Sequence, residues 1–227
     1  MRTTISKEEV RKFKELCGEN RIVSEILKNE FQDYFLEPIL DVGAGIGDIC
    51  FYTCPEKEVY LVDINDFGND FFNPKHKRSV KDFFEFVPER PIKTAFISHT
   101  LQYIDHDVNK LMAKISDLNP ENIILIVNEN EGFIKNILKW VNENCKDASP
   151  GMEVSYFTER YNLKDKKVFI ADLVCDTFDD LADQVAYLML FDYTEDIKNK
   201  LISFLKEEIG GKPAFQIHQA IYLFNSK

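Results

Sequence analysis

The sequence contains little of what marks a secreted, metal-binding or membrane protein. It has four histidines and five cysteines, an odd number, and no two cysteines are spaced as Cys-x-x-Cys. This pattern disfavours a disulfide framework and a zinc site, so we expect buried free thiols and no metal. No apolar run approaches the roughly 20 residues that span a bilayer, and residues 1–10 carry no apolar signal segment. We therefore expect a cytoplasmic protein without membrane contacts.

Basic side chains are also scarce. The chain has 28 Lys and Arg against 39 Asp and Glu, a net charge of −11. Such a surface repels a phosphate backbone, which disfavours nucleic acid as a partner. The concentrated basic patch of Lys75, His76, Lys77 and Arg78 is too short to predict a nucleic-acid site. An acidic surface suits cationic acceptors such as amines, although it is also common in cytosolic enzymes. The oligomeric state stays open.

What the sequence does contain is a regular alternation of strands and helices. Its 227 residues, 44% of them hydrophobic, suit one large α/β domain. Apolar runs without polar interruption predict strands buried on both faces, and helical patterns follow the later ones. This alternation predicts a parallel sheet. The strands are expected at 38–42, 58–63, 94–98 and 122–127, and the helices at 108–118 and 133–144.

The two ends of the chain add further elements without an obvious linker. Ser6 and Glu9 form a capping-box pattern that begins a helical region over 6–30. We expect a strand at 167–175, two helices within 178–209 and a final strand at 214–224. The prediction is a single domain. It comprises an N-terminal helical cover (1–35), a cofactor-binding half (36–130) and a C-terminal half of sheet and helices (131–227).

The informative motif is Ile39-Leu-Asp-Val-Gly-Ala-Gly-Ile-Gly-Asp48, in which a strand enters a glycine-rich turn and a helix follows. Dinucleotide sites use Gly-x-Gly-x-x-Gly, which seats a pyrophosphate on the helix N-terminus. Here the spacing is Gly-x-Gly-x-Gly, and Asp41 precedes the first glycine by two residues. A carboxylate there repels a diphosphate but suits the ammonium and sulfonium of S-adenosylmethionine. A dinucleotide oxidoreductase is therefore the disfavoured alternative.

This motif resembles motif I of the class I S-adenosylmethionine-dependent methyltransferases. The resemblance covers roughly residues 36–130 by motif, and the C-terminal layout is loosely similar to enzymes of the histamine N-methyltransferase type. It implies a Rossmann-like three-layer αβα sandwich. The sheet would be mostly parallel and seven-stranded, with an antiparallel C-terminal strand at 214–224.

The resemblance also implies the site residues. Asp63, 22 residues after Asp41, would accept both ribose hydroxyls of S-adenosylmethionine. Asp82 would accept the adenine amino group, and Phe83 would lie against the adenine ring. Ser98 and His99 would face the methyl group, with His99 as the candidate general base. The cofactor-binding set is Asp41, Gly43, Ala44, Gly45, Gly47, Asp63, Ile64, Asp82, Phe83 and Ser98.

Simpler roles compete with several of these assignments. Asp63 could cap the next helix, and Asp82 could equally cap a helix that starts at Phe83. His99 could anchor its loop, and Tyr103 could line the pocket. The acidic residues 176, 179, 180 and 183 could attract a cationic acceptor or simply form a solvated helix face.

Missing motifs narrow the chemistry. No Asn/Asp-Pro-Pro-Tyr/Phe motif follows the fourth expected strand, which disfavours methylation of base or glutamine amino groups, and no Pro-Cys motif supports pyrimidine C5 chemistry. We expect methyl transfer by in-line displacement to nitrogen or oxygen of a small molecule. The alternatives are an RNA or protein methyltransferase and a non-catalytic S-adenosylmethionine-binding protein.

Overall fold

The computed structural model describes residues 6–68, 70–71, 73–101, 108–145, 154–192 and 194–225. The chain forms two compact units, each assembled from three separate stretches. The sheet unit comprises Asn20–Val127, Met152–Val168 and Ala220–Lys227, and the helical unit comprises Met1–Glu19, Asn128–Gly151 and Phe169–Gln219. The consecutive boundaries expected from the sequence do not coincide with these stretches, and the single-domain organisation stays a prediction.

A seven-stranded sheet of order β3-β2-β1-β4-β5-β7-β6 organises the fold. The first five strands are parallel, and the C-terminal strands are antiparallel, which confirms the predicted fold class. The strands are β1 (Ile39–Val42), β2 (Val59–Asp63), β3 (His76–Val80), β4 (Thr94–Ser98), β5 (Asn122–Asn128), β6 (Asn162–Val174) and β7 (Ala214–Asn225).

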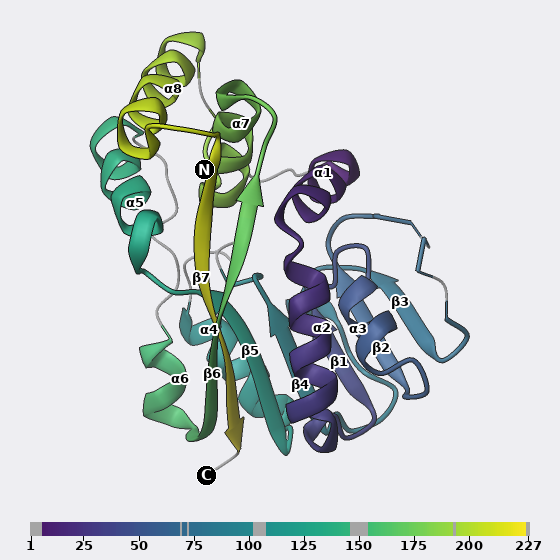
Figure 1. Cartoon of the computed structure of the whole chain (residues 1–227). Coiled ribbons are helices and arrows are strands. Elements are labelled where there is room, and N and C mark those ends of the chain that lie inside the picture. Colours follow the sequence, from purple (N-terminus) through teal and green to yellow (C-terminus); the bar gives the residue numbers. More distant parts are fainter. Residues whose placement is uncertain are drawn as a thin grey trace. The chain divides into compact units, whose positions relative to one another are not determined.

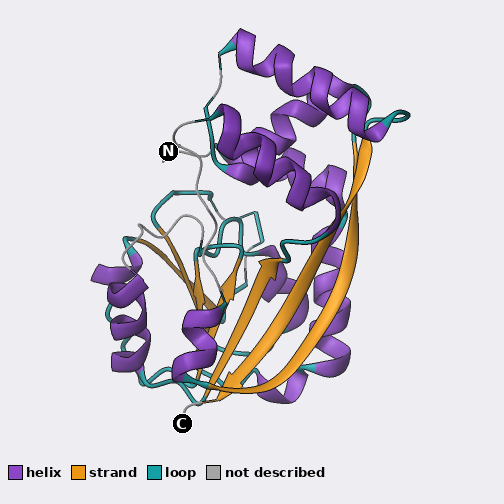
Figure 2. Ribbon diagram, turned by 90° about the vertical axis from the view of Figure 1, so that its left-hand side faces the viewer, coloured by secondary structure: helices purple, strands orange, loops and turns teal. Residues whose placement is uncertain are grey.

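In the sheet unit, alternate residues of each central strand bury opposite faces. Leu40 and Ile97 point into a core shared with α4 (Val108–Leu118) and α6 (Ser155–Arg160). Phe96 points the other way, where its ring lies 5.6 Å from that of Phe35. Figure 1 shows α2 (Glu19–Glu30) and α3 (Asp48–Thr53) in front of the strands and α4 behind them. Helices also flank both sides of the strands in the lower half of Figure 2.

Strand β3 was not expected from the sequence. It contains most of the stretch that looked like a basic patch, and it pairs in parallel with β2 from Val59↔His76 to Asp63↔Val80. All five of its residues are exposed or half-buried, because β3 lies at the edge of the sheet. An edge strand can be polar and charged, so it lacks the apolar run by which β1, β2, β4 and β5 were predicted.

The helical unit contains α1 (Lys7–Cys17), α5 (Gly132–Asn144), α7 (Phe178–Met189) and α8 (Glu195–Ile209), together with residues 169–174 of β6 and 214–219 of β7. The capping box is confirmed: the side chain of Ser6 accepts from the Glu9 backbone N–H, and Glu9 Oε2 accepts from the Ser6 backbone N–H at 2.9 Å. Gly210 ends α8 at φ +65°.

Three of the four acidic residues at 176, 179, 180 and 183 form ion pairs with lysines. Lys12 pairs with Asp180 at 2.8 Å, and Lys198 pairs with Asp179 and Asp183 at 2.9 Å each. The acidic cluster is therefore partly neutralised by lysines. All five cysteines are buried and free, which confirms the predicted thiols. No helix in the described ranges is long and apolar enough to cross a membrane.

Candidate functional site

The glycine-rich turn lies at the carboxyl end of β1 and is fastened to β2. The backbone N–H groups of Gly43 and Ala44 both donate to the carbonyl of Val62, at 2.8 and 3.1 Å. The φ values of Gly43, Gly45 and Gly47 are +68°, +56° and +81°. Residues with a Cβ rarely adopt such values. The turn therefore holds a defined shape, and α3 begins directly after it at Asp48.

Gly43 and Gly45 are glycines for different reasons. A Cβ on Gly43 would lie 2.3 Å from the side chain of Thr100, whose hydroxyl donates to the Val42 carbonyl at 2.8 Å. A Cβ on Gly45 would meet no other atom within 4 Å. The main chain at Gly45 is thus open on one side, where a ligand could approach it closely.

Asp63 ends β2 and faces this turn. Its Oδ2 accepts from the Gly45 N–H at 2.9 Å, and its Oδ1 accepts from the Asn65 N–H at 2.8 Å. The side chain is only 9% exposed, and burial raises the pKa of its carboxyl, while these two hydrogen bonds and Arg78 lower it. Each oxygen can accept a second hydrogen bond, so Asp63 could bind two adjacent hydroxyls.

Arg78 belongs to the site and was missed by sequence reasoning. Its Nη1 donates to the Gly45 carbonyl at 2.9 Å, so β3 supports the glycine turn. A donor facing that turn could have been suspected only if β3 had been recognised as the strand paired with β2.

The rest of the basic stretch is engaged elsewhere. Lys77 pairs with Glu58 at 3.2 Å and with Glu89 at 2.8 Å. The ring Nε2 of His76 lies 3.4 Å from the Cys54 carbonyl oxygen. These side chains serve local structure and do not form one common basic surface.

Two exposed apolar side chains stand beside Asp63. Ile64 is 66% exposed and Val80 is 48% exposed, and Val80 is the register partner of Asp63. Apolar side chains at the ends of adjacent parallel strands could cover one face of a flat ring. Ile64 was in the predicted cofactor set, whereas Val80 was not, because β3 was not predicted.

Asp82 takes the capping role that the sequence left open. Its Oδ1 accepts from the Phe84 N–H at 2.9 Å and begins a short 3-10 helix, η2 (Phe83–Glu85). Phe83 is 7% exposed and belongs to the core of the sheet unit. The structure does not test the predicted contacts of either residue with adenine.

Ser98 ends β4 and His99 follows it, next to the glycine turn. Ser98 is half-buried. His99 has φ +50°, a conformation uncommon for residues other than glycine, and its N–H donates to the Ile126 carbonyl at 3.0 Å. Thr100 is buried between this segment and Gly43. Tyr103 lies outside the described residues.

Asp41 is buried within β1, at 3% exposure. It lies near Cys50 of α3: a hydrogen bond with Cys54 and burial raise the pKa of Cys50, and the charge of Asp41 raises it further. Asp48 of α3 accepts a short hydrogen bond from Asn20. Asp41 thus lies in the strand before the turn, and Asp48 lies at the start of the helix after it. Within the described ranges, no group of three potential ligands could hold a metal ion.

Sheet order, glycine turn and a carboxylate at the end of β2 together define a Rossmann-like fold of the methyltransferase type. No protein-family profile matches the sequence, and no curated protein matches it. Comparison of folds, in contrast, finds many similar solved structures.

Three of these structures illustrate the range of proteins that have a similar fold. The N-methyltransferase NodS from Bradyrhizobium japonicum WM9, in complex with S-adenosyl-L-homocysteine, is 9% identical, with a TM-score of 0.53 over 92% of this chain and 87% of that one. Magnesium protoporphyrin IX methyltransferase from Synechocystis PCC 6803, with S-adenosylhomocysteine bound, is 10% identical, with a TM-score of 0.54 over 96% and 87%. A candidate RNA methyltransferase from Pyrococcus horikoshii is 12% identical, with a TM-score of 0.51 over 92% and 84%. At these identities the likeness concerns the fold.

Proposed function

We propose that this protein is an S-adenosylmethionine-dependent methyltransferase that methylates nitrogen or oxygen of a small molecule. One observation carries the proposal: the Asp63 carboxylate faces the open glycine turn and accepts from Gly45 N–H at 2.9 Å. Two similar structures, NodS and the protoporphyrin methyltransferase, hold S-adenosylhomocysteine in the same fold, which supports the choice of cofactor.

The residues present fit that cofactor. The open side of Gly45 leaves room for the methionine part against the main chain, while Asp63 offers both oxygens to the ribose hydroxyls. Ile64 and Val80 offer exposed apolar surface to the adenine ring, and Asp82 keeps its Oδ2 for the adenine amino group. A dinucleotide is disfavoured by the glycine spacing, since Gly43, Gly45 and Gly47 form Gly-x-Gly-x-Gly and not the Gly-x-Gly-x-x-Gly of dinucleotide sites.

The protein's part in the reaction is mainly positional. S-adenosylmethionine supplies a methyl group that its sulfonium already activates. Asp63 and the glycine turn would hold that cofactor in one orientation, and Ser98 and His99 would line the acceptor side. Holding the acceptor atom about 3–3.5 Å from the methyl carbon lowers the activation barrier by several kcal/mol. His99 would take up the acceptor's proton only where the acceptor carries one.

Charge supports a small acceptor over RNA. The chain carries −11 overall, and Lys77 and Arg78 are engaged by carboxylates and by the Gly45 carbonyl. Three points stay predictions: the cytoplasmic location, the likeness to histamine N-methyltransferase, and catalysis in preference to simple cofactor binding.

Incubation with labelled S-adenosylmethionine and separate amine, phenol, RNA and protein pools would identify the acceptor class. No transfer to any pool would favour the non-catalytic alternative.

Calorimetry with S-adenosylhomocysteine tests the cofactor assignment. In Asp63→Asn, an amide replaces one acceptor oxygen with a donor that faces a backbone N–H. Losing a hydrogen bond to a charged group costs about 1.5–3 kcal/mol, so we expect affinity to fall roughly 10- to 100-fold.

Asp66→Asn is the matched control. Asp66 is an exposed aspartate that also accepts a backbone N–H, that of Gly68, at 2.9 Å, and its substitution removes the same charge. Equal affinities of the two variants, or heat with NAD but none with S-adenosylhomocysteine, would contradict the proposal.

A further inference from the structure

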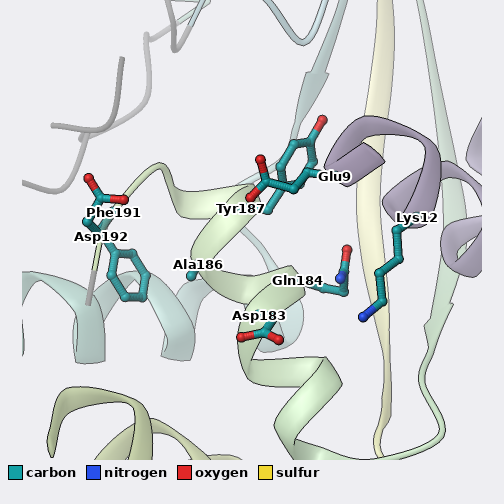
Figure 3. A pocket seen from close by; sticks show the side chains of 8 residues that line it. All are labelled: Glu9, Lys12, Asp183, Gln184, Ala186, Tyr187, Phe191 and Asp192. Atoms are coloured by element: carbon teal, nitrogen blue, oxygen red, sulfur yellow. The ribbon is translucent and has the colours of Figure 1, made fainter. Parts of the chain in front are cut away.

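A pocket lies wholly within the helical unit, between α1 and α7. Its volume is about 400 Å³, within the range that small-molecule ligands occupy. Figure 3 shows side chains from both helices and from the segment after α7 around it. The lining includes Glu9, Lys12, Asp183, Gln184, Tyr187 and Phe191.

The pocket has firm walls. Lys12 of α1 forms an ion pair with Asp180 of α7 at 2.8 Å. The rings of Phe13 and Tyr187 also connect the two helices, with centroids 5.0 Å apart. After α7, Phe191 is 3% exposed, and its N–H donates to the Ala186 carbonyl at 3.2 Å. These contacts link α1, α7 and the segment after α7 around the pocket.

Gln184 is the unusual member of the lining. It is 4% exposed, yet its Oε1 has no hydrogen-bond partner. Figure 3 shows its amide extending from α7 toward the side of the pocket where Lys12 lies. Leaving a buried acceptor unpaired is costly and uncommon. A ligand that donates a hydrogen bond to this oxygen would remove that cost.

Charge and shape narrow that ligand further. The lining holds the carboxylates of Glu9, Asp183 and Asp192 against one cation, Lys12, and Lys12 is itself matched by Asp180 outside the lining. Asp183 also pairs with Lys198 at 2.9 Å. Among the lining residues, carboxylates outnumber cations by three to one.

The pocket also offers aromatic surface. The rings of Tyr187 and Phe191 both line it, and aromatic faces attract organic cations. A ligand with a cationic head and an apolar body would use both features of the lining.

We propose that this pocket binds a compact protonated amine. The ammonium would donate to Gln184 Oε1 within the field of Asp183, and the apolar body would lie against Tyr187 and Phe191. The inference concerns binding alone and does not depend on the proposed methyltransferase activity.

Titration of the full chain with phenethylammonium chloride tests it, with 2-phenylethanol as the neutral analogue of equal shape. We expect the amine to bind at least about tenfold more tightly than the alcohol, because only the amine adds a charge-assisted hydrogen bond. Equal binding of the two probes, or no binding of the amine, would overturn the inference.

Two variants on one helix provide the matched comparison. Asp183→Asn and Asp179→Asn remove the same charge and the same kind of pairing with Lys198, but only Asp183 lines the pocket. Amine affinity should fall about tenfold in Asp183→Asn and hold in Asp179→Asn. Equal effects of the two would overturn the inference.

Gln184→Leu is a second, independent probe. It should bind the amine about tenfold more weakly while melting no lower than the unsubstituted chain, because it removes an unpaired buried acceptor. Unchanged amine affinity in Gln184→Leu would count against the site. S-adenosylhomocysteine titrated into the same samples separates the two proposals: its binding without amine binding overturns only this one, and the reverse result overturns only the cofactor assignment.

Discussion

Two glycines of the turn, identical in the sequence pattern, have different surroundings. Gly43 lies against Thr100, whereas Gly45 faces open space. Gly43→Ala adds a steric overlap of about 1–3 kcal/mol to the roughly 1–2 kcal/mol of a left-handed backbone. Gly45→Ala adds only the backbone cost. In urea titrations we therefore expect Gly43→Ala to lose clearly more stability than Gly45→Ala.

For cofactor binding we expect the opposite order, with the larger loss of affinity in Gly45→Ala. A methyl group on Gly45 points into the space assigned to the cofactor, so S-adenosylhomocysteine affinity should fall in Gly45→Ala although the fold is nearly intact. Equal denaturation midpoints for the two variants, or full affinity in Gly45→Ala, would contradict the described geometry.

At the residue scale, the positions of site residues could be predicted from the sequence, but their hydrogen-bond partners could not. Asp63 could be predicted, because an acid at the end of the strand after a glycine turn is recognisable from spacing. Its bonds to Gly45 and Asn65 could not, since they depend on how the turn bends back toward β2. The contact of Arg78 with the Gly45 carbonyl required a strand that the pattern did not reveal.

Among the elements, α7 offers a direct test of local capping. The Thr177 hydroxyl accepts from the Asp180 N–H at 3.0 Å and donates to Asp180 Oδ2 at 2.7 Å. Thr177→Ala should cost about 1 kcal/mol, or roughly 2–4 °C in melting temperature. Thr177→Ser retains the hydroxyl and should melt close to the unsubstituted chain. A drop of the same size in both variants would show that the cap contributes nothing.

Elements were predictable where burial dictated composition. β1, β2, β4 and β5 have apolar runs because helices cover both faces, and their bounds agree with expectation to within a residue. β3 and the start of β6 did not stand out. β6 begins at Asn162 and not at Lys167, and its first five residues are exposed. Backbone pairing, which leaves no mark in side-chain pattern, sustains such edge segments.

For the whole molecule, the five buried thiols provide a test of compactness. Burial raises the pKa of Cys175 to about 11, and it also raises the pKa of Cys17 and Cys145. Thiolates are the reactive form, so the native protein should react slowly with a disulfide reagent at mildly alkaline pH. All five cysteines should react rapidly in guanidinium. Fast labelling of the native chain, at the rate of free glutathione, would contradict this packing.

The division into two units could not be predicted at this scale. Each unit joins stretches far apart in the chain, and no glycine- or serine-rich linker separates them. Composition reports local burial, whereas this grouping depends on long-range contacts. The pocket around Gln184 was equally hidden, because its lining combines residues of α1 with residues of α7 that lie far away in the sequence, such as Lys12 and Asp183.

The guanidinium of Arg78 connects the outermost parallel strand, β3, to the glycine turn. Neighbouring residues of a strand point to opposite sides, so a slip of β3 by a single position would swing this side chain away and release the Gly45 carbonyl. Correct alignment of a polar, solvent-facing ribbon is thereby coupled to the shape of the loop two strands inward. Mutations that loosen this edge of the sheet should therefore weaken binding of the proposed cofactor without changing any of the residues proposed to contact it.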